Sequence, residues 1–597
     1  MRGPIGPQQI EQMHVLRDSG AEGAPPDEGP GPWLWFALAL LSTFLPFALN
    51  WGVIGVGDFD QFAAFNQIAL WWHALGDRAV TWNPYLCGGA TLVGNPQVPL
   101  FHPNLPIFWL FGPVNGMGLS FLPWMAVGFW GMWKLARVYG LRRKPAAWVA
   151  TAWVLNGFFI GQFGSMHVLY SAFYVLPILF LLNRAIARRG DLRALAAMPF
   201  ALVLPSLYNH HFLAYAFPFV VAHFLLEAWS WRREPRPTKK LVLYGLSVVL
   251  AVGMLGVFMI PSLSWNQEFP RLMAGEFEPP LSLIQMLLFP YPIIPFELQH
   301  DQFERYYVLG PVIFFLFIVG LRRRIFLRPE LRPLVGLGAL AFLTAIGSLE
   351  PFDLPRIMPF DLLRQFVPGY QAMRVPSRFF INAIPAILLV TGLAWQQIED
   401  NGHWTKNRRR WVLGGALVPL LLFNFGYLHF SLFSEERGVD RPQPAQQAAD
   451  FHWAPTGYEF QMMRVLEPNV GVLDCYEALE SPQAEGLAAE HGFVLSADPS
   501  VEVKRLNWGE ITVRTPAPTR VRFNFNHHRD WRVVQTDGAA KIVSENREPL
   551  ELVISDGGFA RLQYQVPPWA LGVKVTLVAL ALALLFAAAC VVGWRRP

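Results

Sequence analysis

Charged residues and cysteines are both scarce in this chain. Of its 597 residues only 15% are charged and 53% are hydrophobic, and the mean hydropathy is +0.30. That balance excludes an ordinary soluble globular protein. The three cysteines, Cys87, Cys475 and Cys590, are too few for a disulfide framework or a thiolate metal site. A single bridge between Cys87 and Cys475 is the alternative to unpaired thiols, which we expect.

The sequence also lacks a cleavable signal peptide, a fixed-period repeat and a strand, glycine-rich loop and helix unit that would bind a nucleotide. Residues 1–31 are rich in Gly, Pro and acidic residues, which predicts a disordered cytoplasmic tail. The formal net charge of +5 comes from short basic clusters between apolar runs. Such clusters describe membrane topology and disfavour nucleic acid as a partner.

Long apolar runs are what the sequence has in abundance. A bilayer core is crossed by about 20 apolar residues, and the basic clusters between the runs mark cytoplasmic loops. The sequence therefore predicts a polytopic α-helical membrane protein of about 12 transmembrane helices, with both ends in the cytoplasm. The predicted spans are 33–56, 117–138, 147–162, 168–183, 193–208, 212–230, 241–261, 307–321, 333–347, 378–396, 411–432 and 568–593.

Two predicted outward segments are too long to be simple connections. The first, residues 57–116 (the first loop), follows the first span; the second is residues 434–566. In the second, six stretches alternate apolar and polar residues between turn formers, which is typical of a small β-sandwich. We expect a bundle over 32–433, an extracytoplasmic β-rich domain over 434–566, and a final helix with a short cytoplasmic end over 567–597. The six stretches are 501–504, 510–514, 520–525, 531–534, 550–554 and 560–564.

The strongest local signal is the sequence Gly57-Asp58-Phe59-Asp60-Gln61. It stands where the first span leaves the bilayer, and residues 62–75 after it predict a helix lying along the membrane interface. A carboxylate there can meet a lipid-bound substrate, which favours a catalytic role for one of the two acids. The alternative is that Asp58 or Asp60 caps that helix, and the two roles can coincide.

Further polar groups gather on the same predicted face. Gln61, His102, His167, His210 and His211 belong to outward loops, where ionisable groups usually face a bundle interior or a water-filled cavity. A hydrogen-bonded structural role is the alternative for His102. Adjacent histidines on a helix diverge, so His210 and His211 alone make no metal site, and no cofactor is firmly implied. A divalent cation held by Asp58 and one histidine stays an open alternative.

Arginine is rare on the predicted outward face, yet Arg374 and Arg378 lie just before a span. A guanidinium at headgroup depth can hold a lipid phosphate with its fork of donors. Snorkelling, or pairing with Asp353 or Asp361, is the alternative.

Taken in order, these features resemble the bacterial YfhO-like membrane proteins of the GT-C superfamily. The resemblance rests on Gly57, Asp58 and Gln61, on Gly88 and Gly89, on the Arg-x-Pro-x-Arg element at Arg374, Pro376 and Arg378, and on Trp531 with Asp537-Gly538. The stretch from His527 to Trp531 departs from the family pattern because it lacks a Pro and a Gly.

The resemblance implies an inverting glycosyltransferase in the bacterial cytoplasmic (inner) membrane. It would take a sugar from a polyprenyl-phosphate carrier and pass it to an envelope glycan, lipid or protein on the extracytoplasmic face. The catalytic base falls on Asp58, with Asp60 the weaker candidate, and the arginines would hold the carrier phosphate. The rival functions are a flippase for lipid-linked sugars and an envelope-assembly scaffold. Lack of a detectable repeat disfavours the first and the many spans disfavour the second.

Overall fold

In the computed structural model the described residues are 32–55, 59–75, 81–95, 98, 100–164, 166–229, 237–268, 309–347, 358–367, 370, 373, 375–401, 406–433, 439–440, 451–454, 461–466, 469–473, 486–489, 491–545 and 548–594. Asp58 and Arg374 lie outside this set.

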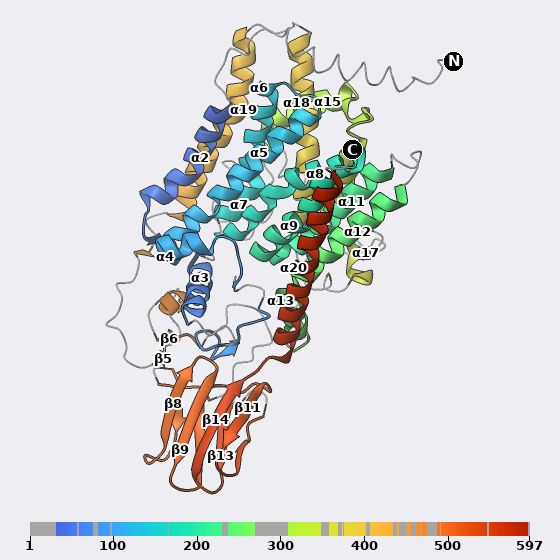
Figure 1. The fold of residues 1–597 in the computed structure, drawn as a ribbon. Coiled ribbons are helices and arrows are strands. Elements are labelled where there is room, and N and C mark those ends of the chain that lie inside the picture. The colour runs from blue at the N-terminus through green and yellow to red at the C-terminus, as the bar shows by residue number, and fades with distance from the viewer. Residues whose placement is uncertain are drawn as a thin grey trace.

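The chain forms a helical bundle with a β-sandwich at one end (Figure 1). Helix α3 lies between the two parts, and α20 runs from the sandwich along the bundle. The helices are α2 (Pro32–Leu49), α3 (Phe59–Ala74), α4 (Leu105–Ser120), α5 (Leu122–Val138), α6 (Arg143–Val154), α7 (Gly157–Gly164), η1 (Val168–Val175), α8 (Leu176–Arg189), α9 (Leu192–Tyr208), α10 (His210–Tyr215), α11 (Phe217–Trp229), α12 (Pro237–Met254), α13 (Gly256–Glu268), α15 (Pro311–Arg322), α16 (Arg332–Ala345), α17 (Pro359–Phe366), η8 (Pro376–Asn382), α18 (Ile384–Asp400), α19 (Lys406–Gly426), η10 (Gln461–Leu466) and α20 (Pro567–Trp594).

Every predicted span overlaps a helix of the bundle. Within the described part of the chain, six helices are long and apolar enough to cross a membrane, or eight if each of two bent pairs is one span. Four shorter apolar helices coincide with the remaining predicted spans. The chain is therefore a multi-pass membrane protein, whereas the predicted count of spans is not established by these lengths.

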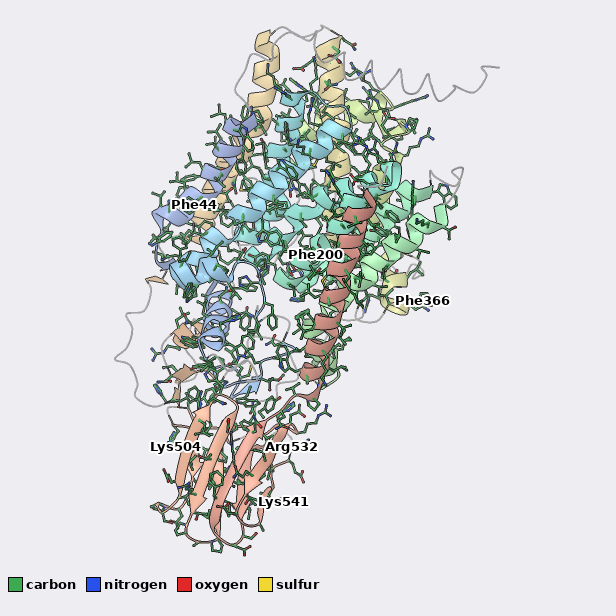
Figure 2. All side chains as sticks on the ribbon, in the orientation of Figure 1. Phe44, Phe200, Phe366, Lys504, Arg532 and Lys541 are labelled. Carbon is green, nitrogen blue, oxygen red and sulfur yellow. The ribbon has the colours of Figure 1, made fainter. Side chains whose placement is uncertain are left out.

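The surfaces of the two parts differ in chemistry. In Figure 2 the labelled phenylalanines Phe44, Phe200 and Phe366 lie on the helical part, whereas the labelled basic residues Lys504 and Arg532 lie on the sandwich. Phe366 is 69% exposed. Many apolar residues of α20 are exposed too. An apolar outer surface suits a bundle that faces lipid, and a charged one suits a domain in water.

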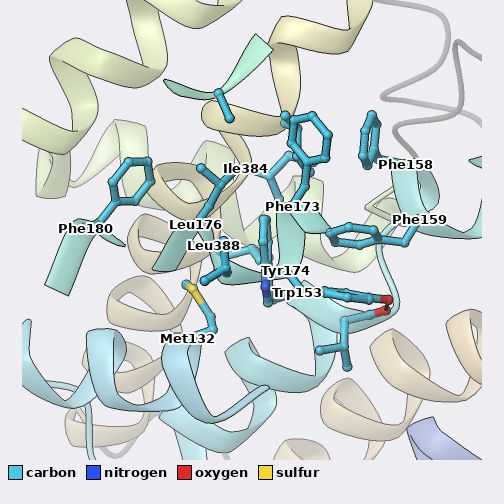
Figure 3. Packing of buried hydrophobic residues seen from close by; sticks show 14 of the residues in the cluster. Met132, Trp153, Phe158, Phe159, Phe173, Tyr174, Leu176, Phe180, Ile384 and Leu388 are labelled. Atoms are coloured by element: carbon cyan, nitrogen blue, oxygen red, sulfur yellow. Dashed lines mark hydrogen bonds between the residues drawn. The ribbon is translucent and has the colours of Figure 1, made fainter. Parts of the chain in front are cut away.

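Tightly packed aromatic rings fill the bundle (Figure 3). The rings of Phe159 and Tyr174 stack with centroids 3.7 Å apart, and Trp153 meets Phe159 edge to face at 5.4 Å. The short helices α6 and α7 and the 3-10 turn η1 are therefore packed into the core of the bundle.

Charges are buried where α8 meets α11. The carboxylate of Glu227, which is fully buried, accepts from Arg184 at 3.0 Å and from Arg188 at 2.9 Å. The Arg184 guanidinium also lies 4.3 Å from the ring centroid of Tyr139. A carboxylate with two guanidinium partners has the compensation that burial of a charge requires.

Helices α12 and α13 form one of the bent pairs, with an angle of 66° at the break. The break is bridged by Thr576 of α20, whose hydroxyl accepts from the Val257 amide at 2.7 Å and donates to the Met254 carbonyl at 3.2 Å. Backbone groups freed by a broken helix need such partners inside a membrane, so α20 holds the bend in place.

The sandwich consists of two antiparallel four-stranded sheets, in the orders β12-β13-β10-β7 and β11-β14-β9-β8. All six predicted strands are present, and two short ones, β7 and β12, were not predicted. The strands of the chain are β1 (Val53–Ile54), β2 (Trp82–Asn83), β3 (Ala90–Thr91), β4 (Val439–Asp440), β5 (His452–Trp453), β6 (Val470–Gly471), β7 (Val494–Ser496), β8 (Glu502–Asn507), β9 (Glu510–Thr515), β10 (Thr519–Asn526), β11 (Trp531–Thr536), β12 (Ala540–Ile542), β13 (Pro549–Ile554) and β14 (Gly558–Tyr564).

The first loop and the sandwich share one hydrophobic core. Trp82 of β2 meets Trp531 of β11 at 5.4 Å and Tyr564 of β14 at 4.8 Å, and all three side chains are buried. Residues Phe65, Ile68 and others of α3 belong to the same core. The β-rich domain is therefore packed onto the first loop and is not a separate module.

The prediction of unpaired thiols is wrong for Cys87, which forms a disulfide, whereas Cys590 is a free, buried thiol. Cys475, the other half of the bridge that the sequence offered as the alternative, lies outside the described residues. Cys87 follows strand β2, so the bridge adds a covalent link to the contacts that already hold the first loop.

Candidate functional site

The segment that leads to the candidate acids is held by a short antiparallel pair. Strand β1 pairs with β4, with Val53 opposite Asp440, and α3 then begins at Phe59. Asp60 therefore lies in the first turn of α3, where the helix dipole favours a carboxylate. Its Oδ1 accepts from the Gln61 amide at 2.8 Å. The Asp60 side chain is only 8% exposed and that of Gln61 1%.

The position of this helix along the membrane interface stays a prediction, but the structure shows that protein covers most of its apolar side chains. Helix α3 forms as expected, but most of its residues are buried, among them Phe59, Ala63, Phe65 and Trp72. Its apolar side chains point to all sides, which is the pattern of a helix enclosed by protein. It packs between the bundle and η10, so Asp60 and Gln61 face a protein interior.

His167 lies beside the start of α3. Its ring meets the ring of Phe62 edge to face at 5.6 Å, and Phe62 directly follows Gln61. The Nδ1 atom of His167 lies 3.0 Å from Oε1 of Gln162. Because a carboxamide oxygen only accepts, this contact places a proton on Nδ1. His167 and the first turn of α3 thus approach one another from segments far apart in sequence.

Arg378 lies in η8 and is 7% exposed. Its guanidinium carbon is 4.9 Å from the ring centroid of Tyr170 and 5.7 Å from that of Tyr215. Two aromatic faces stabilise a buried cation and orient its planar fork of donors. Such an arginine is suited to bind an anion, above all one with several oxygens.

Tyr170 brings the predicted residues together. Its ring lies 5.9 Å from that of His167 and stacks on that of His211 at 5.4 Å, while Arg378 lies over it. We call Tyr170, His167, His211 and Arg378 the Tyr170 cluster. Tyr170 was not among the predicted site residues, since one tyrosine in an aromatic-rich chain carries no distinguishing signal.

His210 and His211 begin α10, and Asn209 caps that helix by accepting from the His211 amide at 2.8 Å. The two imidazole rings are 4.0 Å apart and tilted by 38°. His211 turns to the Tyr170 cluster, whereas His210 lines a neighbouring cleft. Adjacent residues on a helix point in different directions, so the pair connects the two places.

His102 is tied into the first loop. Its Nδ1 accepts from the Asn104 amide at 3.0 Å and its Nε2 lies 3.1 Å from Oδ1 of Asn66. Burial, and secondly the charge of His73, lowers the pKa of His102 to about 3. The neutral imidazole therefore acts as acceptor at one nitrogen and donor at the other. No ring contact joins it to the described part of the Tyr170 cluster.

A small cleft beside His210 has an interior volume of about 30 Å³. Its walls come from the first loop, the end of α9, the start of η1, the start of α13 and the first turn of α20. None of the described residues that line it is an Asp, Glu, Lys or Arg. The lining residues are Leu92, Val93, Gly94, Asn95, Val98, Leu100, Phe101, Leu169, Ser206, Leu207, Tyr208, His210, Val257, Phe258 and Trp569.

The glycine pair of the first loop allows close contact with the sandwich. Gly88 and Gly89 have φ angles of 70° and 92°, and a Cβ on Gly89 would lie 2.4 Å from the Trp82 ring. Asn526 of β10 donates to the carbonyls of Cys87 at 2.7 Å and Gly89 at 2.9 Å. These glycines therefore serve loop docking.

The turn before Trp531, which departs from the family pattern, is well formed. Nδ1 of His528 lies 3.0 Å from the Tyr564 hydroxyl and accepts from the Asp530 amide at 3.3 Å. Burial, with the charges of His527 and Arg532, lowers the pKa of His528 to about 4. The neutral ring thus stabilises the turn without the Pro and Gly.

A metal centre is not seen in the residues that the structure describes, where no three His, Cys, Asp or Glu side chains group to hold an ion. The alternative of a cation shared by Asp58 and a histidine lies outside those residues. Within the described site, the cluster can bind an anion at Arg378, and the imidazoles of His167 and His211 can exchange protons or hydrogen bonds with a ligand.

Neither the models of known protein families nor the curated protein sequences give a match to this chain. Among solved structures, the chain is similar to the crystal structure of ArnT from Cupriavidus metallidurans in the apo state. The sequence identity is 14% and the TM-score 0.43, over 74% of this chain and 86% of that one. A likeness of this size establishes neither a common fold nor a common activity.

Proposed function

We propose that this protein is a membrane glycosyltransferase of the GT-C type. It transfers a sugar from a polyprenyl-phosphate carrier to an acceptor of the cell envelope, on the extracytoplasmic face of the bacterial cytoplasmic membrane. The observation that carries the proposal is the buried guanidinium of Arg378, which lies over Tyr170 within a cluster of histidines in the helical bundle of a membrane protein.

Arg378 is the proposed holder of the carrier phosphate. The guanidinium of Arg378 is buried against two tyrosine faces that orient its planar fork of donors, and the several oxygens of a phosphate match such a fork. Arg374, four residues earlier in the same Arg-x-Pro-x-Arg element, is the second proposed phosphate ligand. A guanidinium beside the leaving phosphate oxygen stabilises the negative charge that develops on that oxygen in the transition state.

Asp58 is the proposed general base, as the sequence resemblance suggests, and Asp60 is the weaker candidate. The acceptor hydroxyl loses its proton to the carboxylate while its oxygen bonds to the anomeric carbon. The bond between that carbon and the phosphate oxygen breaks, and the polyprenyl phosphate leaves with the electron pair. A single displacement of this kind inverts the configuration at the anomeric carbon.

The test is transfer of labelled sugar from a panel of polyprenyl-phosphate sugars to envelope extract by the purified protein. Loss of a general base costs about a hundredfold to ten-thousandfold, so Asp58→Asn should reduce transfer by that factor. Arg378→Lys keeps the charge but loses the planar fork, and should cost about a hundredfold or more. Comparison of Asp60→Asn with Asp58→Asn shows which of the two acids is the base.

Matched controls come from the sandwich, far from the cluster. Asp556→Asn and Arg520→Lys make the same chemical changes at exposed positions and should leave transfer unchanged. If Asp58→Asn and Asp60→Asn both transfer as well as the wild type, the proposed base is wrong. If no donor is used at all, the proposed activity is wrong.

A flippase for lipid-linked sugars is the second candidate, and the bent pair of α12 and α13 favours it. Broken helices that line a cavity are a common feature of transporters. The cleft beside the break is lined by Val257 and Phe258 of α13. A carrier lipid that crosses proteoliposomes without loss of its sugar would support this function over transfer.

A further inference from the structure

His102 is fixed between the first loop and helix α3, with a hydrogen-bond partner at each ring nitrogen. The Asn104 amide donates to Nδ1 at 3.0 Å, so the proton of the neutral ring lies on Nε2. Nε2 in turn donates to Oδ1 of Asn66, 3.1 Å away, and both side chains are buried. Since both nitrogens are engaged within the protein, His102 is not placed to bind a substrate, although the sequence suggested that role.

Asn66 continues the link from His102 into the backbone of α3. Its Nδ2 donates to the carbonyl of Phe62 at 2.8 Å. Phe62 lies in the first turn of α3 together with Asp60, and its ring meets the ring of His167 at 5.6 Å. The link from His102 therefore ends beside a proposed acid and beside the Tyr170 cluster.

The other side of the His102 ring is held by the bundle. The ring meets that of Phe108 edge to face at 5.2 Å and lies 5.4 Å from the ring of Tyr208. Tyr208 stacks on Trp124 at 5.1 Å, and its hydroxyl lies 3.3 Å from Oγ of Ser120. These buried side chains come from α4, α5 and α9. His102 is thus a fixed point of the bundle to which α3 is attached.

The place of the first turn of α3 matters for the proposed chemistry. The chain enters α3 from β1, a strand of only two residues. A general base must lie within hydrogen-bond reach of the hydroxyl that it deprotonates, and a displacement of about 1 Å can cost about a hundredfold in rate. The attachment of α3 therefore affects whether an acid at its start reaches the acceptor.

We propose that His102 is a positioning residue, which through its bond to Asn66 holds the start of α3 where the base meets the acceptor hydroxyl. This inference rests on the proposed function, because His102 acts through the acid at the start of α3 and contacts neither donor nor acceptor. Loss of the bond should lower kcat and leave the KM for the carrier unchanged, since the carrier phosphate is assigned to Arg378.

Two substitutions of similar shape separate the two hydrogen bonds of the ring. In His102→Gln the amide nitrogen reaches the place of Nε2 and still donates to Asn66, whereas the bond from Asn104 is lost. In His102→Asn the amide oxygen takes the place of Nδ1 and still accepts from Asn104, whereas the bond to α3 is lost. Each variant keeps one bond and loses one, so both should lose similar amounts of stability.

The two variants should differ in activity. With a donor found in the panel, His102→Asn should lower kcat by about tenfold to a hundredfold, whereas His102→Gln should stay close to the wild-type kcat. The KM for the carrier should be unchanged in both. His491→Asn and His491→Gln make the same changes at an exposed histidine of the β-rich domain, and should leave kcat and KM unchanged.

Hydrogen exchange of the full-length protein supplies a readout that needs no substrate. Amides of residues 59–66 should exchange about tenfold faster in His102→Asn, which corresponds to the loss of one hydrogen bond, and as slowly as in the wild type in His102→Gln.

Asn66→Ala breaks the same bond from the side of the helix, and serves as the second variant if His102→Asn does not fold. Its kcat should fall as in His102→Asn. The double variant should lose little more than either single variant, because two residues that act through one bond are not additive. Full addition of the two losses would overturn the inference.

Three other results would contradict the positioning role. A fall of kcat in both His102 variants in proportion to their losses of stability would show a structural role alone. A rise in the carrier KM with kcat unchanged would place His102 at the donor. Unchanged exchange of residues 59–66 in His102→Asn would show that the bond does not hold α3. Failure of the wild type to use any donor contradicts the proposed activity itself, and is distinguished from these results because the exchange experiment does not depend on transfer.

Discussion

Substitution of two asparagines of strand β10 should have different effects on the docking of the first loop. Asn526 donates to the carbonyls of Cys87 and Gly89, whereas Asn524 donates to the carbonyls of Ala488 and Gly492 within the β-rich domain. Both side chains are buried, with exposed fractions of 2% and 0%. Of these two side chains, only that of Asn526 therefore hydrogen-bonds to the segment that follows α3.

The size of the expected loss of stability follows from the hydrogen bonds that each substitution removes. Asn526→Ala removes two hydrogen bonds and leaves two buried carbonyls without that donor, at about 1–2 kcal/mol for each, so about 2–4 kcal/mol in total. Asn524→Ala removes bonds of the same kind and number or more. The two variants should thus lower the overall stability by similar amounts, but at different places.

Hydrogen exchange followed by mass spectrometry distinguishes the places. In Asn526→Ala, amides of residues 81–95 should exchange faster by about 30-fold to 1,000-fold, which corresponds to the estimated free energy. In Asn524→Ala the acceleration should appear in residues 486–494. Sugar transfer should fall further in Asn526→Ala, because the displaced loop leads to His102, the proposed anchor of α3.

Faster exchange of residues 81–95 in both variants to the same extent would refute the reasoning, since the loop would then depend on the sandwich as a whole. The reasoning would also be refuted if residues 81–95 of Asn526→Ala exchange as slowly as in the wild type after the Cys87 disulfide is reduced. Reduction removes the covalent link that could mask the effect.

Three further predictions concern stability. Glu227→Gln removes the charge of a buried carboxylate that pairs with the partly buried Arg184 and the more exposed Arg188, and should lower stability in detergent by about 1–3 kcal/mol; Glu399→Gln, at an exposed ion pair, should cost less than about 1 kcal/mol. The pKa of His528, lowered from 6.5 to about 4, means that the unfolded chain binds more protons between these values. Stability should therefore fall by about 2 kcal/mol from pH 7 to pH 5, and His528→Gln should flatten this slope. Reduction of the Cys87 disulfide should destabilise the protein by about 2–4 kcal/mol.

Each of these has a direct readout. Equal losses for Glu227→Gln and Glu399→Gln would contradict the buried network. A stability profile for His528→Gln that matches the wild type between pH 5 and pH 7 would contradict a neutral buried imidazole. Alkylation of the denatured protein should modify Cys590 alone before reduction, and modification of Cys87 at that stage would contradict the disulfide.

The positions of spans and strands could be predicted because each has a periodic or compositional signal. The stretches 510–514 and 560–564 alternate strictly, and they form β9 and β14. The environment of α3 could not be predicted, since an aromatic helix beside a membrane span has the same composition whether lipid or protein covers it. Only the position of the sandwich decides between the two.

The grouping of the candidate site was only partly predictable. Scarce polar residues at span ends indicated His167, His211 and Arg378, and the structure brings these three around Tyr170. Their common contact depends on how η1, α10 and η8 pack, which no local pattern specifies. The sequence shows Gly88 and Gly89 only as part of a family resemblance. The physical reason for glycine there is close contact with Trp82 and Asn526, which exists only once the sandwich has folded.

The most direct test of the central claim is the release of free polyprenyl phosphate by the purified protein, measured together with the glycosylated product. The proposed displacement predicts that carrier and product appear in equal amounts, and that both fall together in Asp58→Asn and in Arg378→Lys. Movement of intact sugar-linked carrier across the membrane, with no release of free carrier, would contradict glycosyl transfer and assign the bundle to transport.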